Sequence, residues 1–177
     1  MKSQNQADIE KLLKLYSSGD FSRALDETNE MIARFPRSFT LRSIAGAIRQ
    51  GLNQYDLAAK EFKLALEIQP THADTHYNLG VALAATGNRE AAIQSYQQAL
   101  KHNPALVPAI MNLGQLLHAQ GQTDATIDLY QKALTIAPLD SEIYFQLGMV
   151  LEDLNRWDQA QDAYRQSIQL DPRNVKS

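Results

Sequence analysis

The stretch YNLGVALAATG at residues 77–87 returns at residues 111–121 as MNLGQLLHAQG, 34 residues further along the chain. The same interval separates most of the prolines, four glycines and four aromatic residues. These are Pro36, Pro70, Pro104, Pro138 and Pro172, then Gly46, Gly80, Gly114 and Gly148, then Phe62, Tyr96, Tyr130 and Tyr164. A fixed period of this length is typical of proteins built from stacked repeats, each of which is one supersecondary unit.

Each period predicts two helices joined by a turn. In residues 73–86, apolar side chains recur with helical spacing, and the Gly87-Asn88 pair that follows is typical of a helix end. Residues 89–103 carry a second apolar stripe. This stripe ends at Pro104, because proline lacks an N–H and disfavours helix in the residue before it. The chain is therefore expected to be all-α.

Small residues at fixed positions indicate how the two helices of a repeat pack. Gly80 has no Cβ, so we expect the first helix to approach the second closely, opposite Ala92 and Ala99. Tyr96 is then expected to fill the space between neighbouring repeats. A single helix pair cannot bury all of its apolar surface, so stacked pairs would form a continuous core.

The spacing resembles the signature of the tetratricopeptide repeat family, which reads W-x2-L-G-x2-Y, then A-x3-F, then P. The third repeat matches it with His76, Leu79, Gly80, Leu83, Ala92, Tyr96 and Pro104. The first repeat departs most, with Leu12 in place of the glycine and Thr28 in place of the aromatic residue. The resemblance implies a right-handed α-solenoid of about five helix–turn–helix units. These units would form a single domain over residues 1–177, with repeats at about 5–38, 39–72, 73–106, 107–140 and 141–174.

The resemblance also implies a protein-interaction module that binds an extended peptide or partner segment in a concave groove lined by the first helices. Helical spacing separates the buried stripe of these helices from a neighbouring stripe that would face the groove. In the second repeat this stripe would include Ile44. In the later repeats we predict peptide contacts by Asp74, Tyr77, Asn78, Met111, Asn112, Gln115, Glu142, Phe145, Gln146 and Met149.

Packing does not explain the recurrent amides Asn78 and Asn112, with Gln146 in the same register. A primary amide carries donors and an acceptor, so it can pair with a peptide backbone whatever the peptide's side chains. This resembles the asparagine ladder with which family members hold extended peptides. The alternative is that asparagine is merely tolerated on an exposed helix face.

Large apolar residues form a second row beside the amides, at Tyr77, Met111 and Phe145. Such a row at solvent indicates a contact patch, unless it packs on adjacent repeats or on the ends of the chain. The stripe of the third to fifth repeats carries acidic residues and no Lys or Arg. We therefore expect apolar or basic peptides to be preferred over acidic ones.

Composition excludes several classes of function. The formal net charge is −3 and the sequence pI is about 5.8, which disfavours nucleic-acid binding and the pentatricopeptide RNA readers considered as an alternative. The chain has no cysteine, so disulfides and thiolate zinc sites are excluded. The N-terminal segment lacks a signal-peptide core, and no run is apolar enough for a membrane span. We expect a cytoplasmic protein without a cofactor.

Two local patterns resemble chemical sites and are rejected. His72 and His76 have a metal-chelating spacing, yet no Glu follows His72 as H-E-x-x-H requires, so we expect packing roles instead. The stretch GAIRQGLN at residues 46–53 has the glycines of a phosphate loop, with Leu52 and Asn53 where Lys and Ser or Thr are needed. We predict that this chain is not itself an enzyme.

Three hypotheses about function remain open. The chain is a peptide-binding module, the non-catalytic substrate-positioning part of a larger enzyme of glycosyltransferase, sulfotransferase or oxygenase type, or a self-assembling scaffold. The segment RNVKS follows Pro172 where a further first helix would begin, and part of the last apolar stripe lacks a covering helix. Either the native protein continues beyond Ser177, or a homodimer or another partner covers Trp157, Tyr164 and Ile168.

Overall fold

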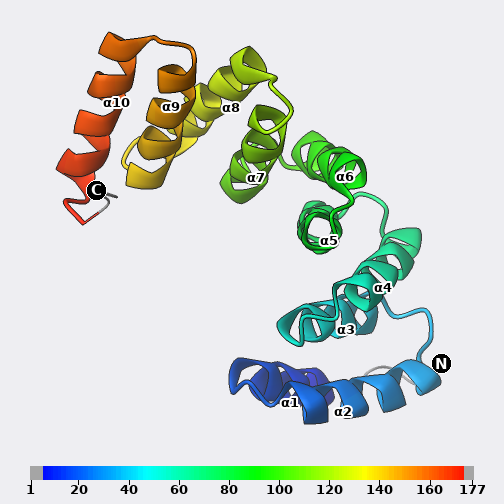
Figure 1. Cartoon of the computed structure of the whole chain (residues 1–177). Coiled ribbons are helices and arrows are strands. Elements are labelled where there is room, and N and C mark those ends of the chain that lie inside the picture. The colour runs from blue at the N-terminus through cyan, green and yellow to red at the C-terminus, as the bar shows by residue number, and fades with distance from the viewer. Residues whose placement is uncertain (1–5, 174–177) are drawn as a thin grey trace. The chain divides into compact units, whose positions relative to one another are not determined.

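The computed structural model describes residues 6–173, which form ten α-helices and contain no strand. The helices are α1 (Gln6–Ser17), α2 (Phe21–Arg34), α3 (Phe39–Gly51), α4 (Tyr55–Ile68), α5 (Ala73–Ala85), α6 (Arg89–His102), α7 (Val107–His118), α8 (Thr123–Ile136), α9 (Ser141–Asp153) and α10 (Trp157–Leu170). Each repeat consists of two successive helices that run antiparallel (Figure 1). The predicted all-α fold of helix pairs is confirmed.

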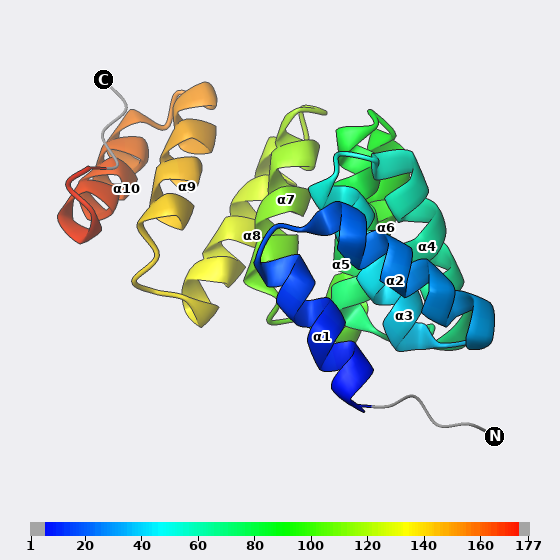
Figure 2. The same cartoon turned by 90° about the horizontal axis from the view of Figure 1, so that it is seen from below.

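The chain divides into two compact units. Unit 1 spans Met1–His102 and contains α1 to α6, and unit 2 spans Asn103–Ser177 and contains α7 to α10. In unit 1, α2 packs on α3 and α4 packs on α5, and in unit 2, α8 packs on α9 (Figure 2). Inside each unit, a second helix therefore contacts the first helix of the next repeat. The single domain over residues 1–177 stays a prediction, and its repeat limits at residues 5 and 174 lie outside the described residues.

The turn inside each repeat contains one residue with positive φ. These residues are Gly19 (φ 79°), Asn53 (58°), Gly87 (79°), Gly121 (76°) and Asn155 (56°), and they keep the 34-residue interval. Glycine adopts this left-handed conformation without steric penalty, and asparagine is the side chain that tolerates it best. The predicted helix end at Gly87 therefore recurs in all five repeats, twice with asparagine in place of glycine.

Side-chain caps begin several of the first helices. Ser38 Oγ accepts a hydrogen bond from the N–H of Leu41 at 3.3 Å, and Asp140 Oδ1 accepts one from the N–H of Glu142 at 3.0 Å. His72 takes the same role at the start of α5, where its Nδ1 accepts from the N–H of Thr75 at 3.3 Å. These bonds satisfy N–H groups that have no partner inside the helix.

The glycine of each first helix faces the aromatic ring of the second helix in the same repeat. A Cβ on Gly80 would lie 2.5 Å from the ring of Tyr96, which is 2% exposed. The same pairing joins Gly46 with Phe62, Gly114 with Tyr130, and Gly148 with Tyr164. The predicted close approach is present, and the aromatic ring of the second helix occupies the space that the missing Cβ leaves. Thr126, the equivalent of Ala92, donates to the carbonyl of Gly114 at 3.3 Å, so this position of the second helix also lies against the first. Tyr96 was expected between neighbouring repeats, whereas its ring lies against Gly80 of its own repeat.

The first repeat keeps the same architecture, but here the first helix carries the larger side chain and the second helix the smaller one. Leu12 stands at the glycine position and Thr28 at the aromatic position, and both are fully buried. Leu12 packs with Met31 and Leu41, and the Thr28 hydroxyl donates to the carbonyl of Ala24 at 2.6 Å. A larger residue on one helix and a smaller one on the other conserve core volume, which cores tolerate well.

Candidate peptide-binding surface

In unit 2, one face of α7 and one face of α9 form a stripe beside the core. The core side of these helices holds buried residues such as Leu113 and Leu147. The neighbouring positions are all exposed or half-buried, as helical spacing requires for a face turned away from the core. This unit 2 stripe consists of Pro108, Met111, Asn112, Gln115 and His118 of α7, with Glu142, Phe145, Gln146, Met149, Glu152 and Asp153 of α9.

A side-chain contact shows that the two faces lie next to each other. His118 Nε2, at the end of α7, lies 2.7 Å from Asp153 Oδ2, at the end of α9. Helical spacing places both residues on the stripe, but their pairing was not foreseen. The repeat register could have indicated their proximity. Glu152 is the equivalent of His118 in the next repeat, and Asp153 is the residue after it.

The structure brings two of the three predicted amides onto these neighbouring helices. Asn112 and Gln146 occupy the same register position and are both half-buried. Gln146 Nε2 donates a hydrogen bond to Glu142 Oε1 at 2.7 Å, one turn earlier in α9. A primary amide has two N–H donors and a carbonyl acceptor, so this bond uses only part of its capacity.

The predicted row of large apolar residues lies beside the amides and rests partly on its own repeat. The ring of Phe145 is 5.8 Å from that of Tyr164, and the ring of Tyr77 in unit 1 is 5.9 Å from that of Tyr96. Both Phe145 and Tyr77 remain half-buried, so each offers its other side to solvent. Each aromatic residue is thus held in place by packing with its second helix.

Carboxylates dominate the charge of the unit 2 stripe. Glu142, Glu152 and Asp153 lie on it, and none of its described positions carries Lys or Arg. The hydroxyl of Tyr164 donates to Glu152 Oε2 at 2.7 Å. Burial, this hydrogen bond and the nearby carboxylates raise the pKa of Tyr164 above its usual value. Burial and the charge of Glu142 raise the pKa of Tyr130 to about 12, so both tyrosines are neutral at physiological pH.

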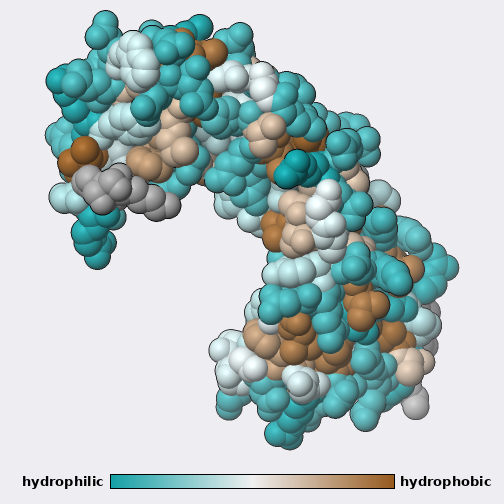
Figure 3. Space-filling model, viewed as in Figure 1, coloured by the Kyte–Doolittle hydropathy of each residue, from teal (hydrophilic) through white to brown (hydrophobic). Residues whose placement is uncertain are grey.

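Unit 1 carries the corresponding stripe on α5 and its neighbours. Asp74 is exposed on α5, and Tyr77 and Asn78 are half-buried. On α1 the same register holds Leu13, which is 50% exposed, and Tyr16, which is 39% exposed. In the space-filling view, hydrophobic side chains gather over α3 and α4, whereas the visible surface of α8 to α10 is mostly hydrophilic (Figure 3).

One predicted member of the stripe is wrong. Ile44 of α3 is 9% exposed and packs in a core cluster with Ala24 of α2 and Ile48. It is buried because α1 and α2 both lie against this part of α3, and Ile9 of α1 joins the cluster. The second repeat therefore presents other positions beside its core, including the half-buried Gln50.

The residues of the rejected metal and phosphate patterns have structural contacts. His72 caps α5, and its ring centroid lies 4.8 Å from that of Phe39. His76 Nε2 lies 2.8 Å from the carbonyl oxygen of Pro70. Gly46 is inside α3 against Phe62, far from the conformation of a phosphate loop. Within residues 6–173, no helix combines the length and apolar composition that a membrane span requires.

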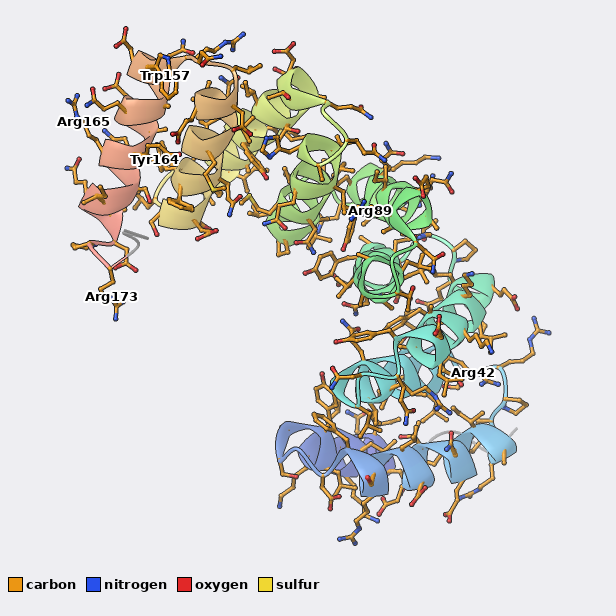
Figure 4. The ribbon with its side chains drawn as sticks, viewed as in Figure 1. Arg42, Arg89, Trp157, Tyr164, Arg165 and Arg173 are labelled. Atoms are coloured by element: carbon orange, nitrogen blue, oxygen red, sulfur yellow. The ribbon has the colours of Figure 1, made fainter. Side chains whose placement is uncertain are left out.

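The predicted self-association residues lie along one face of α10, on which Tyr164 also contacts α9. Trp157 is 59% exposed, Ile168 is 44% exposed, and Tyr164 is half-buried. They line one shallow hollow together with Glu152, Asp158 and Arg165. Figure 4 shows Trp157 at the N-terminal end of α10 and Arg165 pointing away from α9.

Comparison with solved structures agrees with this fold. MamA has a TM-score of 0.87 at 22% identity, covering 99% of this chain and 100% of that one. MamA from Desulfovibrio magneticus RS-1 has a TM-score of 0.86 at 19% identity, covering 97% of both chains. YrrB, a TPR protein with an unusual peptide-binding site, has a TM-score of 0.82 at 19% identity, covering 97% of this chain and 88% of that one. At these identities the likeness concerns the fold.

Comparison by sequence identifies the repeats. A probable UDP-N-acetylglucosamine–peptide N-acetylglucosaminyltransferase, SEC from Arabidopsis thaliana, is 35% identical over 81 residues, which is 46% of this chain and 8% of that protein. Models of the tetratricopeptide repeat match residues 73–106 and 106–173, and a TPR repeat model matches residues 51–87. The matched residues thus run from 51 to 173 through successive repeats of one kind, and the chain belongs to the tetratricopeptide repeat family.

Proposed function

We propose that the chain is a protein-interaction module and that the unit 2 stripe holds an extended peptide segment. The observation that carries this proposal is the pair of amides, Asn112 and Gln146, in the same register on neighbouring helices. Half-buried apolar side chains flank both of them. YrrB, which shares the fold, has a peptide-binding site, and this likeness supports the proposal without fixing the site.

One extended backbone can reach both amides. Asn112 and Gln146 lie on successive first helices, and an extended peptide rises about 3.3 Å per residue. The two amides would therefore meet backbone groups several residues apart along the peptide. The side chains between those groups would lie over Met111, Phe145 and Met149, where apolar contact adds to the hydrogen bonds of the amides.

Charge defines the class of peptide. Glu142 and Asp153 lie on the same stripe as the amides, and Glu152 lies one turn from Met149. A basic peptide is attracted to this surface, whereas an acidic one meets like charge. We therefore propose that the partner segment is apolar or basic.

Selection from a library of capped random dodecapeptides tests the proposal. The immobilised chain should enrich peptides with apolar and basic residues, and each selected peptide can then be synthesised and titrated. Changing Asn112 and Gln146 together to Ala removes two backbone contacts, each worth about 0.5–1.5 kcal/mol net. Affinity should fall by about 5- to 150-fold.

A matched control separates contact from general surface change. Gln97 and Gln131 are exposed amides on the second helices, away from the stripe, and their replacement by Ala should leave affinity unchanged. Replacing Glu142 and Asp153 by Gln and Asn should weaken basic peptides and spare apolar ones. Equal affinities for the stripe and control variants, with helical content intact, would contradict the proposal.

The match to SEC favours a second candidate. The 81 residues shared with that glycosyltransferase are 8% of its length, so this chain would correspond to a small part of such an enzyme. In that case the stripe would position a peptide substrate for a catalytic domain on the same polypeptide. Sequencing the full coding region decides between the two, since a catalytic domain encoded in the same reading frame supports the second candidate and its absence rejects it.

A further inference from the structure

The second helix of a repeat has a face that the next first helix covers. In unit 1, Leu41 of α3 shares a core cluster with Met31 of α2, and Ile44 and Ile48 of α3 share another with Ala24 of α2. The face of α2 at this contact also includes Phe21, Leu25 and Ile32. These contacts define which positions of any second helix serve to bind a following helix.

In α10 the same register positions are open to solvent. They are Trp157, Gln161, Tyr164 and Ile168, which we name the α10 face. Trp157 and Ile168 are exposed, and Tyr164 is half-buried, whereas its equivalent Tyr130 is 1% exposed beneath α9. Large side chains that bury apolar area in other repeats therefore remain uncovered here, which marks an interaction surface.

The N-terminal helix cannot serve as the cover. In α1 the positions that correspond to the docking residues of α3 are Ala7, Glu10, Lys14 and Ser18, and all four are exposed. Burying Glu10 and Lys14 against Trp157 and Ile168 would remove charges from water without compensation. Head-to-tail association of copies, α10 on α1, is therefore disfavoured.

We propose that the α10 face binds the same face of a second copy of this chain, with the two α10 helices antiparallel about a two-fold axis. Residues 157, 161, 164 and 168 are placed symmetrically about the midpoint of residues 162 and 163. Antiparallel pairing thus sets Trp157 of each copy opposite Ile168 of the other. A two-fold contact is self-complementary and closes after two copies.

Charges at the rim of the face fit the antiparallel pairing. Asp158 lies near the start of α10 and Arg165 near its middle, on the edge of the hollow. Asp158 and Arg165 are seven residues apart and lie on one edge of the face, so antiparallel pairing brings Asp158 of one copy beside Arg165 of the other, twice, whereas parallel pairing would place them on opposite edges. Within one chain, Arg165 Nη1 lies 3.3 Å from Asp162 Oδ1, and this exposed pair is weak enough to exchange partners.

Charge exchange between copies gives a sharp test. Sedimentation of the 177-residue chain from about 5 to 500 µM should show a monomer–dimer equilibrium, weak because a single helix pair buries less area than a standard interface. Asp158→Arg and Arg165→Glu should each reduce dimerisation, since each sets like charges opposite one another. An equimolar mixture of the two variants should recover a heterodimer, because both cross-pairs then have opposite charges.

Two further variants complete the experiment. Trp157→Ala should raise the dissociation constant about tenfold or more, because Trp157 is the largest exposed apolar side chain of the face. Lys132→Glu changes an exposed charge on α8 and should leave dimerisation as it is. A wild-type chain that stays monomeric throughout, or a mixture that dimerises no better than its components, would overturn the proposal. So would a longer native chain that remains monomeric because its own following helix covers α10.

Discussion

The fourth and fifth repeats, both in unit 2, have the same parts in different surroundings. Tyr130 of α8 lies against Gly114 and is almost completely buried, while Tyr164 of α10 lies against Gly148 and is half-buried. The difference arises because α9 packs on α8. One register position is therefore core in one repeat and part of a surface in the next, where its hydroxyl reaches the stripe residue Glu152.

The glycine positions should show the largest difference between the two repeats. A Cβ at Gly114 would collide with the Tyr130 ring, which has no room to move, so Gly114→Ala should cost about 1–3 kcal/mol of stability. A Cβ at Gly148 would lie 2.6 Å from the Tyr164 ring, which can shift toward solvent. Gly148→Ala should therefore cost less, and alanine's better helix propensity, about 1 kcal/mol, offsets part of it. Urea unfolding measures both, and equal losses would contradict the comparison.

The second largest effect should be a loss of folding stability at alkaline pH, caused by ionisation of the buried Tyr130. The pKa of Tyr130 in the folded chain is about 12, above the value of about 10 for an unfolded chain. Because the folded state holds this proton more tightly, its stabilising effect is complete below pH 10 and is lost as pH rises toward 12. Tyr130→Phe should make stability fall less steeply over this window in urea unfolding at several pH values. An unchanged slope would show that Tyr130 does not titrate in this way.

Substitutions in the turns of the fourth and fifth repeats should have the smallest effects on stability. Gly121 has φ 76° with no atom within 4 Å of a built Cβ, so Gly121→Ala should cost about 1–2 kcal/mol through backbone strain alone. Asn155 has φ 56° in the equivalent turn, and Asn155→Gly should stabilise the chain by a few tenths of a kcal/mol at most, since asparagine already tolerates this conformation. Thermal unfolding of the two variants checks the opposite signs. Destabilisation by Asn155→Gly would mean that its side chain has another role.

The repeat register predicted much of this structure, because it fixes which residues share a face. It located the helices, the turn at Gly87 and the half-buried positions of Asn112 and Gln146 beside the core. Register alone cannot say how far a neighbouring helix extends, and for that reason Ile44 was placed on a stripe when it lies in the core. The position of Tyr96 was misjudged for a related reason, since periodicity does not tell which helix an aromatic ring faces.

The contacts between side chains on different helices could not be predicted from the sequence. His118 and Asp153 approach because the ends of α7 and α9 meet, and that meeting depends on packing. A partly buried ion pair in unit 1 was also unforeseen, in which Arg42 Nη1 lies 2.8 Å from Glu61 Oε2. The two positions carry unlike residues in the other repeats, for example Ile110 in place of Arg42 and Leu129 in place of Glu61, so the repeat register gave no sign that they would pair.

Side-chain amide resonances in a ¹⁵N-labelled sample test the central claim most directly. A peptide selected from the random library would be titrated into the chain while the NH₂ signals of Asn112, Gln146, Gln97 and Gln131 are followed. The account predicts that the signals of Asn112 and Gln146 shift with one common saturation curve and show contacts to the peptide backbone, while the two control signals stay in place. Saturable binding that leaves Asn112 and Gln146 unmoved would contradict it.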